Sequence, residues 1–339
     1  MFQTGMHIAL QSLASDWLTG LMLRITALGY HRIIILLVIA VLFGVSLRRG
    51  FLLFQLIFWT AVVSGIAKDF FGLPRPFFAD SRVACLEPNW DTSGAFHAMG
   101  GRDFFSLPPQ PVIDAFRLRD LSFGFPSGHT SSAFAVWGGL AVVFRKRWLA
   151  WLAPLMIVLI AFSRLYLGVH FLADILGGAV LGSTMILGAW LLWRDESRRE
   201  KPFAVLRGAL LRSAPGILYL FILFGLPLLL AALGLVSMTF TGAYLGLNSA
   251  FALASRRGLP SDHAPLWARL ARVLFGGALF WLTGLALQQA VVLAPALAPA
   301  TPWGQLFHAG LRVFLSVGAG IWLFSRLRLF RERAPGAGV

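Results

Sequence analysis

Long apolar runs separated by short polar segments dominate the chain and predict a bundle of membrane-spanning helices. An α-helix needs about 20 apolar residues to cross the hydrocarbon core of a bilayer, and most of these runs are near that length. The first, third and seventh runs are short. We place nine spans at residues 31–47, 51–71, 128–145, 148–167, 171–193, 215–236, 238–255, 269–292 and 304–325.

The first 29 residues follow a different pattern. Apolar side chains recur at spacings of three and four, and polar side chains fall between them; the apolar residues include Leu10, Leu13, Trp17, Leu21 and Ile25. This is the periodicity of an amphipathic helix, which we expect to lie along the membrane surface. A transmembrane span of poor quality is the alternative. The segment lacks the basic start and the cleavage site of a signal peptide.

The composition supports the membrane assignment. Of the 339 residues, 58% are hydrophobic and 13% are charged, about half the charged share of a typical soluble domain. A soluble protein of this size cannot bury so much apolar surface. The single cysteine, Cys85, excludes an intramolecular disulfide and argues against a structural zinc site.

The charge balance orients the predicted bundle. The formal net charge is +15, with 29 Lys and Arg residues. In a soluble protein this excess would suggest a nucleic-acid partner, but here the basic residues form short clusters between apolar runs. Most of them fall on one set of alternating loops, which the positive-inside rule places in the cytoplasm facing the phospholipid bilayer. We therefore expect no nucleic-acid partner, an external N-terminus and a cytoplasmic C-terminus.

The one long loop, residues 72–125, then lies outside. A loop of this length is usually functional or disordered, and its many aromatic residues argue against disorder. We expect a cap that rests on the outer leaflet. The aromatic residues are Phe77, Phe78, Trp90, Phe104, Phe105 and Phe116.

Three domains follow from these patterns. Residues 1–29 form the interfacial helix, and residues 30–193 form a core bundle that includes the cap loop 72–125. Residues 194–339 form further membrane helices that carry no recognisable motif. A run of charged residues, 194–201, marks the last boundary.

Ionisable side chains at the end of an apolar span are costly and indicate a functional site. Lys68 lies in the last turn of the predicted span 51–71, and Arg75 follows in a turn that Gly72, Pro74 and Pro76 enforce. The alternative is that both cations extend to lipid headgroups.

A second cluster, Ser127-Gly128-His129, opens the predicted span 128–145. Ser127 is a suitable N-cap, and Gly128 allows close approach to the backbone. The unpaired N–H groups of a helix start form a cradle for an anion. The alternative is an ordinary helix start beside an unrelated histidine.

A third cluster joins the predicted spans 148–167 and 171–193. His170 and Asp174 are four residues apart and share a helix face, so that the carboxylate can orient the imidazole. Arg164 adds a planar cation. The pattern fits an oriented nucleophile, and a structural His–Asp pair is the alternative.

Taken together, the three clusters favour phosphoryl transfer. Lys68, Arg75 and Arg164 could neutralise a phosphate in a pocket of low dielectric constant, and two histidines supply a nucleophile and a general acid. The sequence shows no Asp/Glu cluster with the spacing of magnesium ligands. We therefore expect no metal and no other cofactor.

The three segments resemble the signature of the type 2 phosphatidic acid phosphatase superfamily, a family of integral membrane lipid phosphatases. That signature is Lys-x6-Arg-Pro, Pro-Ser-Gly-His, and Ser-Arg-x5-His-x3-Asp. Every position of it is present, and the resemblance covers about residues 33–193. The matching residues are Lys68, Arg75-Pro76, Pro126 to His129, Ser163-Arg164, His170 and Asp174.

The resemblance implies a role for each matching residue. His170 would attack phosphorus, Asp174 would orient it, and His129 would protonate the leaving oxygen and then help water to hydrolyse the phosphohistidine. The phosphate would be bound by Lys68, Arg75, Ser127, Gly128 and Arg164.

We therefore expect an all-α lipid phosphatase in a bacterial cytoplasmic membrane, with its active site facing the periplasm. The favoured substrate is undecaprenyl diphosphate, followed by phosphatidic acid and phosphatidylglycerol phosphate. The nine-span layout resembles that of glucose-6-phosphatase. One alternative is a phosphotransferase that uses the same phosphoenzyme. Another is a phosphate-binding transporter, although the paired broken helices with midplane charges typical of that class are absent. A homodimer is left open.

Overall fold

The computed structural model describes residues 1–119, 122–208, 213–294 and 299–330. The secondary structure within these ranges is entirely helical, so the all-α prediction is confirmed. The chain divides into two compact units. The first comprises Met1–Ile35 and Leu53–Leu191; the second comprises Leu36–Leu52 and the described residues from Leu192 onward.

Six helical segments of the described chain are long and apolar enough to cross a membrane. A bent pair, Asp16–Ala27 with His31–Val45, would add a seventh if its two arms, inclined at 51°, form one span. Nine spans are therefore not confirmed. The six segments are Leu47–Ala79, Arg147–Tyr166, Leu172–Trp193, Ala214–Ala232, Leu266–Leu293 and Pro302–Arg326.

Two of the predicted spans form helices but are not among the six. Residues 128–145 contain α7 (Gly128–Ala133), η2 (Phe134–Gly138) and α8 (Gly139–Phe144), a short stretch whose first turns are polar. Residues 238–255 lie in α14 (Met238–Arg256), which carries threonine, serine and asparagine side chains. The first stretch is broken into short pieces and α14 is rich in polar residues, so neither meets the length and hydropathy expected of a span.

The N-terminal segment forms two helices where one was expected. These are α1 (Gly5–Gln11) and α2 (Asp16–Ala27), and the Oγ of Ser15 caps α2 by accepting a hydrogen bond from the Leu18 amide at 3.3 Å. His7 of α1 is fully buried. The start of the chain is thus part of the interior of the first unit, while an interfacial position for α2 stays a prediction.

The described part of the first unit contains four longer helical stretches. The stretch α7–η2–α8 ends at Arg145, which adopts a left-handed conformation with φ of 52°. The chain then turns into α9 (Arg147–Tyr166), which packs against α7, η2 and α8. After a short turn, α10 (Leu172–Trp193) follows. The helix α4 (Leu47–Phe71) also belongs to this unit from Leu53 onward.

The loop 72–125 is folded in its described part and contains α5 (Pro76–Ala79) and α6 (Gln110–Arg117). Phe77, Phe78 and Phe116 are buried in one apolar cluster. Asp80, which is also buried, accepts hydrogen bonds from Thr4 Oγ1 at 2.7 Å and from the Arg82 guanidinium at 2.8 Å. The described part of the loop is therefore folded, as expected. Its contact with the outer leaflet stays a prediction.

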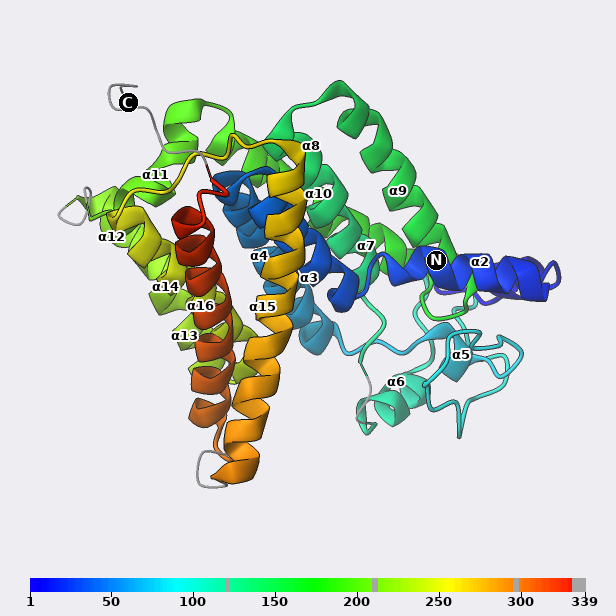
Figure 1. Cartoon of the computed structure of the whole chain (residues 1–339). Helices are drawn as coiled ribbons and strands as arrows, with labels where there is room; N and C mark the ends of the chain where they lie inside the picture. Colours follow the sequence, from blue (N-terminus) through cyan, green and yellow to red (C-terminus); the bar gives the residue numbers. More distant parts are fainter. Residues whose placement is uncertain (120–121, 209–212, 295–298, 331–339) are drawn as a thin grey trace. The chain divides into compact units, whose positions relative to one another are not determined.

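The second unit is built around two closely packed helices, α14 and α16 (Pro302–Arg326), which run side by side in Figure 1. A Cβ atom at Gly242 or Gly246 of α14 would overlap backbone carbonyl groups of α16. The glycines therefore permit the close approach that stabilises helix pairs in membranes. Asn248 donates to the Leu223 carbonyl at 2.7 Å, while the buried Nε2 of His308 has no hydrogen-bond partner among the described residues.

The remaining elements of the second unit are shorter, apart from α15. They begin with the end of α3 (His31–Ile39) and η1 (Ala40–Val45). The others are α11 (Glu196–Leu206), α12 (Ala214–Leu220), η3 (Phe221–Gly225), α13 (Leu226–Ala232) and α15 (Leu266–Leu293).

Candidate active site

The His170 imidazole lies in the turn between α9 and α10, with both ring nitrogens engaged. Its Nδ1 lies 3.1 Å from Asp174 Oδ2, and its Nε2 lies 3.3 Å from a terminal nitrogen of Arg75. The Arg75 guanidinium can only donate, so Nε2 must accept and the proton belongs on Nδ1. An oriented nucleophile would need this tautomer. The lone pair of Nε2 points at the Arg75 guanidinium.

The surroundings of His170 keep its imidazole neutral. The side chain is 1% exposed. Burial, followed by the positive charges of Arg75, Lys68 and Arg164, holds its pKa well below the usual value. A neutral imidazole is the form that can attack phosphorus.

Arg75 and Lys68 both bind the segment 122–124 at the end of the cap loop. Arg75 donates to the carbonyls of Ser122 and Phe123 at 2.8 and 3.2 Å, and to the Val169 carbonyl at 2.7 Å. The ammonium group of Lys68 also donates to the Phe123 carbonyl. The predicted turn thus brings both cations of the first motif to one place.

Ser127 is the N-cap of α7, as predicted. Its Oγ accepts hydrogen bonds from the Thr130 amide at 3.4 Å and from the Thr130 hydroxyl at 3.1 Å. A Cβ atom at Gly128 would lie 3.5 Å from Cε of Lys68, so the helix start and the first motif are adjacent. The buried Nε2 of His129 has no hydrogen-bond partner among the described residues.

Two glycines of α10 allow the second and third motifs to meet. A Cβ atom at Gly178 would lie 2.6 Å from the Ser127 carbonyl oxygen, and one at Gly177 would overlap the Phe125 ring. The Ser127 amide donates to the Asp174 carbonyl at 2.8 Å. This glycine pair was not predicted to belong to the site, although its position three and four residues after Asp174 was a usable signal.

Arg164, at the end of α9, is almost fully buried and pairs with Glu87 of the cap loop. The guanidinium donates to Oε1 at 2.6 Å and to Oε2 at 2.9 Å. It also donates to Thr26 Oγ1 at 2.7 Å. Glu87 was not predicted as a site residue; its only signal was that it is the single glutamate in the loop 72–125.

The N-terminal helix supplies further contacts that the sequence did not indicate. His7 Nε2 lies 2.8 Å from the His170 carbonyl oxygen. The Gln11 side chain donates to the carbonyls of Ala84 and Tyr166 at 2.7 and 3.1 Å. These bonds join α1 to the cap loop and to the turn that carries His170.

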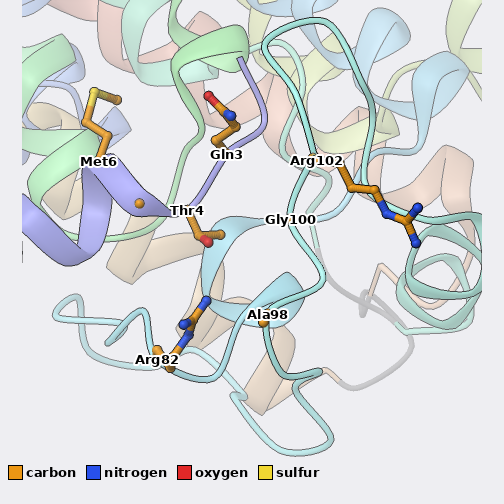
Figure 2. Close-up of a pocket in the computed structure, with 9 residues that line it drawn as sticks. Gln3, Thr4, Met6, Arg82, Ala98, Gly100 and Arg102 are labelled. Atoms are coloured by element: carbon orange, nitrogen blue, oxygen red, sulfur yellow. The ribbon is translucent and has the colours of Figure 1, made fainter.

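All eight residues predicted for the site lie in the first unit. Lys68, Gly128 and His129 are partly exposed. The other five are buried: Arg75, Ser127, Arg164, His170 and Asp174. A separate groove of about 390 Å³ lies between the N-terminus and the cap loop, and its lining, which includes Thr4 and Arg82, contains none of the eight (Figure 2).

The arrangement has the parts needed for phosphoryl transfer. It offers an oriented imidazole, a second imidazole with a buried nitrogen that has no partner, and three cations. Within the described ranges, no three His, Cys, Asp or Glu side chains gather in a way that could hold a metal ion. Independence from metal ions stays a prediction.

Comparisons with known proteins agree with the motif pattern. A lipid A 4'-phosphatase of Bacteroides thetaiotaomicron is 36% identical over 92 residues, which are 26% of this chain and 40% of the relative. Phosphatidylglycerophosphatase B of Bacillus subtilis is 38% identical over 74 residues (19% and 36%). The undecaprenyl-diphosphatase BcrC of the same organism is 39% identical over 57 residues (17% and 28%).

The chain thus covers less than half the length of each of these relatives. No solved structure matches it. Residues 49–198 match the PAP2 superfamily, a range that includes all three motifs and all eight predicted site residues. The resemblance seen in the motifs is confirmed, and the chain carries a PAP2 superfamily domain at residues 49–198.

Proposed function

We propose that this protein is an integral membrane phosphatase that hydrolyses a phosphate or diphosphate monoester of a lipid through a phosphohistidine intermediate. One observation carries the proposal: His170 is held between Asp174 and Arg75, with its unprotonated Nε2 directed at the Arg75 guanidinium. A phosphate bound by that guanidinium would lie beside the attacking nitrogen.

The reaction has two steps. Nε2 of His170 attacks the terminal phosphorus in line, and the bond from that phosphorus to the leaving oxygen breaks. The leaving oxygen is the lipid alkoxide oxygen of a monophosphate or the bridging oxygen of a diphosphate, and His129 gives its proton to it. Neutral His129 then takes a proton from water, whose oxygen attacks phosphorus and displaces His170, so that inorganic phosphate leaves. Throughout, the phosphate oxygens are stabilised by hydrogen bonds and charge from Lys68, Arg75, Ser127, Gly128 and Arg164.

Undecaprenyl diphosphate is our first substrate candidate. It is supported by the similarity to an undecaprenyl-diphosphatase. The phosphate of lipid A is the second, because a lipid A 4'-phosphatase shares 36% identity over 92 residues. Phosphatidylglycerol phosphate and phosphatidic acid follow.

We further propose that the site faces the periplasm from a bacterial inner membrane. The support is the clustering of basic residues on the loops opposite to the cap loop 72–125. Water is the proposed phosphate acceptor, and a lipid hydroxyl is the alternative. The helices after residue 194 have no assigned role, and a dimer interface there is an open alternative.

Phosphate release from purified protein in detergent tests the proposal. The panel contains the four lipid phosphates named above. We expect release from at least one lipid in the presence of EDTA, inhibition by vanadate, and no release by His170→Ala. The matched control is His97→Ala, which alters an exposed histidine of the cap loop. Equal activity in the two variants, or a loss of activity in EDTA that magnesium restores, would contradict this mechanism.

A further inference from the structure

Glu87 is a buried carboxylate in the cap loop that belongs to none of the three motifs. Its side chain is 5% exposed. It accepts two hydrogen bonds from Arg164, one from the Trp90 indole at 2.7 Å and one from the Tyr30 hydroxyl. A buried carboxylate with four hydrogen bonds is held in one orientation, because turning it would break several of these bonds in a poorly solvated place.

The bonds to Glu87 determine which edge of Arg164 stays available. A guanidinium has five N–H groups. Three are used: Glu87 takes one on each terminal nitrogen, and Thr26 takes the second on NH1. The remaining two, on Nε and NH2, lie on the same edge of the plane. Nε is buried and has no partner among the described residues.

That remaining edge suits a phosphate. Two parallel N–H groups of an arginine match two oxygens of a tetrahedral anion. Because the other end of the guanidinium is fixed by Glu87, the edge cannot rotate away without breaking charge-assisted hydrogen bonds. Glu87 and a substrate phosphate would therefore bind Arg164 at the same time, on different edges.

The partners of Glu87 extend this network to two other motif residues. The Trp90 ring lies under the Arg75 guanidinium, with its centroid 4.2 Å from Cζ. The Tyr30 ring meets the His129 ring edge to face, with 5.0 Å between centroids. One carboxylate thus pairs with Arg164 and is linked to Arg75 through Trp90 and to His129 through Tyr30.

We propose that Glu87 is a positioning residue, which fixes Arg164 so that its Nε–NH2 edge is presented to the phosphate of the substrate. This inference rests on the proposed phosphatase function. It adds a residue of the cap loop to the site and gives the cap a part in binding phosphate. The opposite idea, that Glu87 occupies Arg164 in place of phosphate, predicts effects of the opposite sign.

The first test is Glu87→Gln, which keeps the size of the side chain and removes its charge. A preorganised charged partner of this kind is worth roughly 10- to 100-fold. We expect kcat/KM for the lipid substrate to fall by that factor, and binding of inorganic vanadate, measured by calorimetry without lipid, to weaken in proportion. The control Asp91→Asn removes an exposed carboxylate four residues away and should leave both unchanged.

A double-mutant cycle separates positioning from a general weakening of the cap. In an Arg164→Lys background the guanidinium edge is already lost, so Glu87→Gln should add less than threefold. Tighter vanadate binding by Glu87→Gln would show that Glu87 competes with phosphate, and independent, multiplying losses would show that it acts elsewhere. Either result would overturn the proposal.

A second variant and the vanadate measurement cover the cases in which Glu87→Gln does not fold or no lipid is hydrolysed. If Glu87→Gln does not fold, Trp90→Phe removes one donor to Glu87 and retains an aromatic ring under Arg75; it should weaken vanadate binding by a smaller factor, and no change would count against the proposal. If wild-type protein binds vanadate but releases phosphate from no lipid, the proposed phosphatase function fails, while the vanadate data still decide whether Glu87 positions Arg164.

Discussion

The Nε2 atom of His7 lies 2.8 Å from the backbone carbonyl oxygen of His170, although the two residues are 163 positions apart. Nε2 must donate to this carbonyl, so the first helix of the chain holds the turn that carries the candidate nucleophile. Burial lowers the pKa of His7 and favours its neutral form. The geometry of His170 therefore depends on a segment far outside the signature.

Removing this bond should slow catalysis. For His7→Ala we expect kcat to fall by about tenfold, because small displacements of a reacting group are costly. KM should change little. His7→Gln, whose amide can donate to the same carbonyl, should recover part of the rate. Steady-state kinetics on folded variants check this, and a wild-type kcat in His7→Ala would show that the bond is dispensable.

Removing a cation should lower turnover by an amount that depends on whether the cation lies in the site. Lys68→Ala and Arg164→Ala should each lower turnover by on the order of a hundredfold or more, as loss of a preorganised electrostatic partner does. Arg102→Ala, on the exposed surface of the cap loop, should be mild. Phosphate release measures all three. Similar losses in all of them would mean that surface attraction, and not a specific pocket, accounts for the cations.

Arg82 and Arg117, which also lie outside the motifs, are less suitable controls. Arg82 binds the buried Asp80, and Arg117 donates to the carbonyls of Phe71 and Gly72 beside the first motif. The sequence alone would have grouped both with Arg102. We expect their alanine variants to be mild in turnover but to loosen the cap.

The sequence predicted those parts of the site that depend on local spacing. His170 and Asp174 are one helical turn apart, so their hydrogen bond could be expected, and Ser127 had the chemistry of an N-cap. Contacts made by distant segments could not be anticipated. Glu87 and His7 reach the site only because the cap loop and α1 fold over it.

The number of spans is the part of the predicted fold that the structure does not confirm. Apolar runs located the helices well, since each predicted span contains helix in the described structure. Hydropathy does not tell a lipid-facing helix from one packed within the protein. The stretch from Gly128 to Phe144 and α14 are both helical, but neither has the length and composition of the six candidate spans, so their place in the bundle stays a prediction.

Stability should fall on acidification. Burial by itself raises the pKa of Glu87, but hydrogen bonds and charge from Arg164, with help from Tyr30 and Trp90, lower it from 4.5 to about 2. The pKa of Asp80 is lowered by Arg82 and Thr4 against the opposing effect of burial. Folded-state values below the unfolded ones stabilise the protein above about pH 4.5, and this contribution is lost as pH falls from 4.5 towards 2.

Thermal unfolding in detergent at pH 6 and pH 3 measures this effect. The wild-type Tm should be lower at pH 3, and the difference between the two pH values should be smaller in Glu87→Gln. Asp91→Asn is again the control, because Asp91 is exposed. An identical difference in wild type and Glu87→Gln would show that the ion pair with Arg164 contributes no pH-dependent stability.

The single cysteine reports on the orientation in the membrane. Cys85 is half-buried in the cap loop, and burial raises the pKa of its thiol, so labelling by maleimide should be slow and faster at alkaline pH. A membrane-impermeant maleimide should nevertheless label intact spheroplasts. Labelling that requires lysis, at a pH where detergent-solubilised protein reacts, would place the cap loop in the cytoplasm.

The most direct test of the central claim is to trap the phosphoenzyme. The alkoxide of a lipid monophosphate needs the proton of His129 to leave, whereas p-nitrophenolate needs it much less. With p-nitrophenyl phosphate, His129→Ala should therefore accumulate an acid-labile, base-stable phosphohistidine, because no base activates water, and His170→Ala should form none. Accumulation in His170→Ala and not in His129→Ala would exchange the two roles, and its absence from both folded variants would contradict nucleophilic attack by His170.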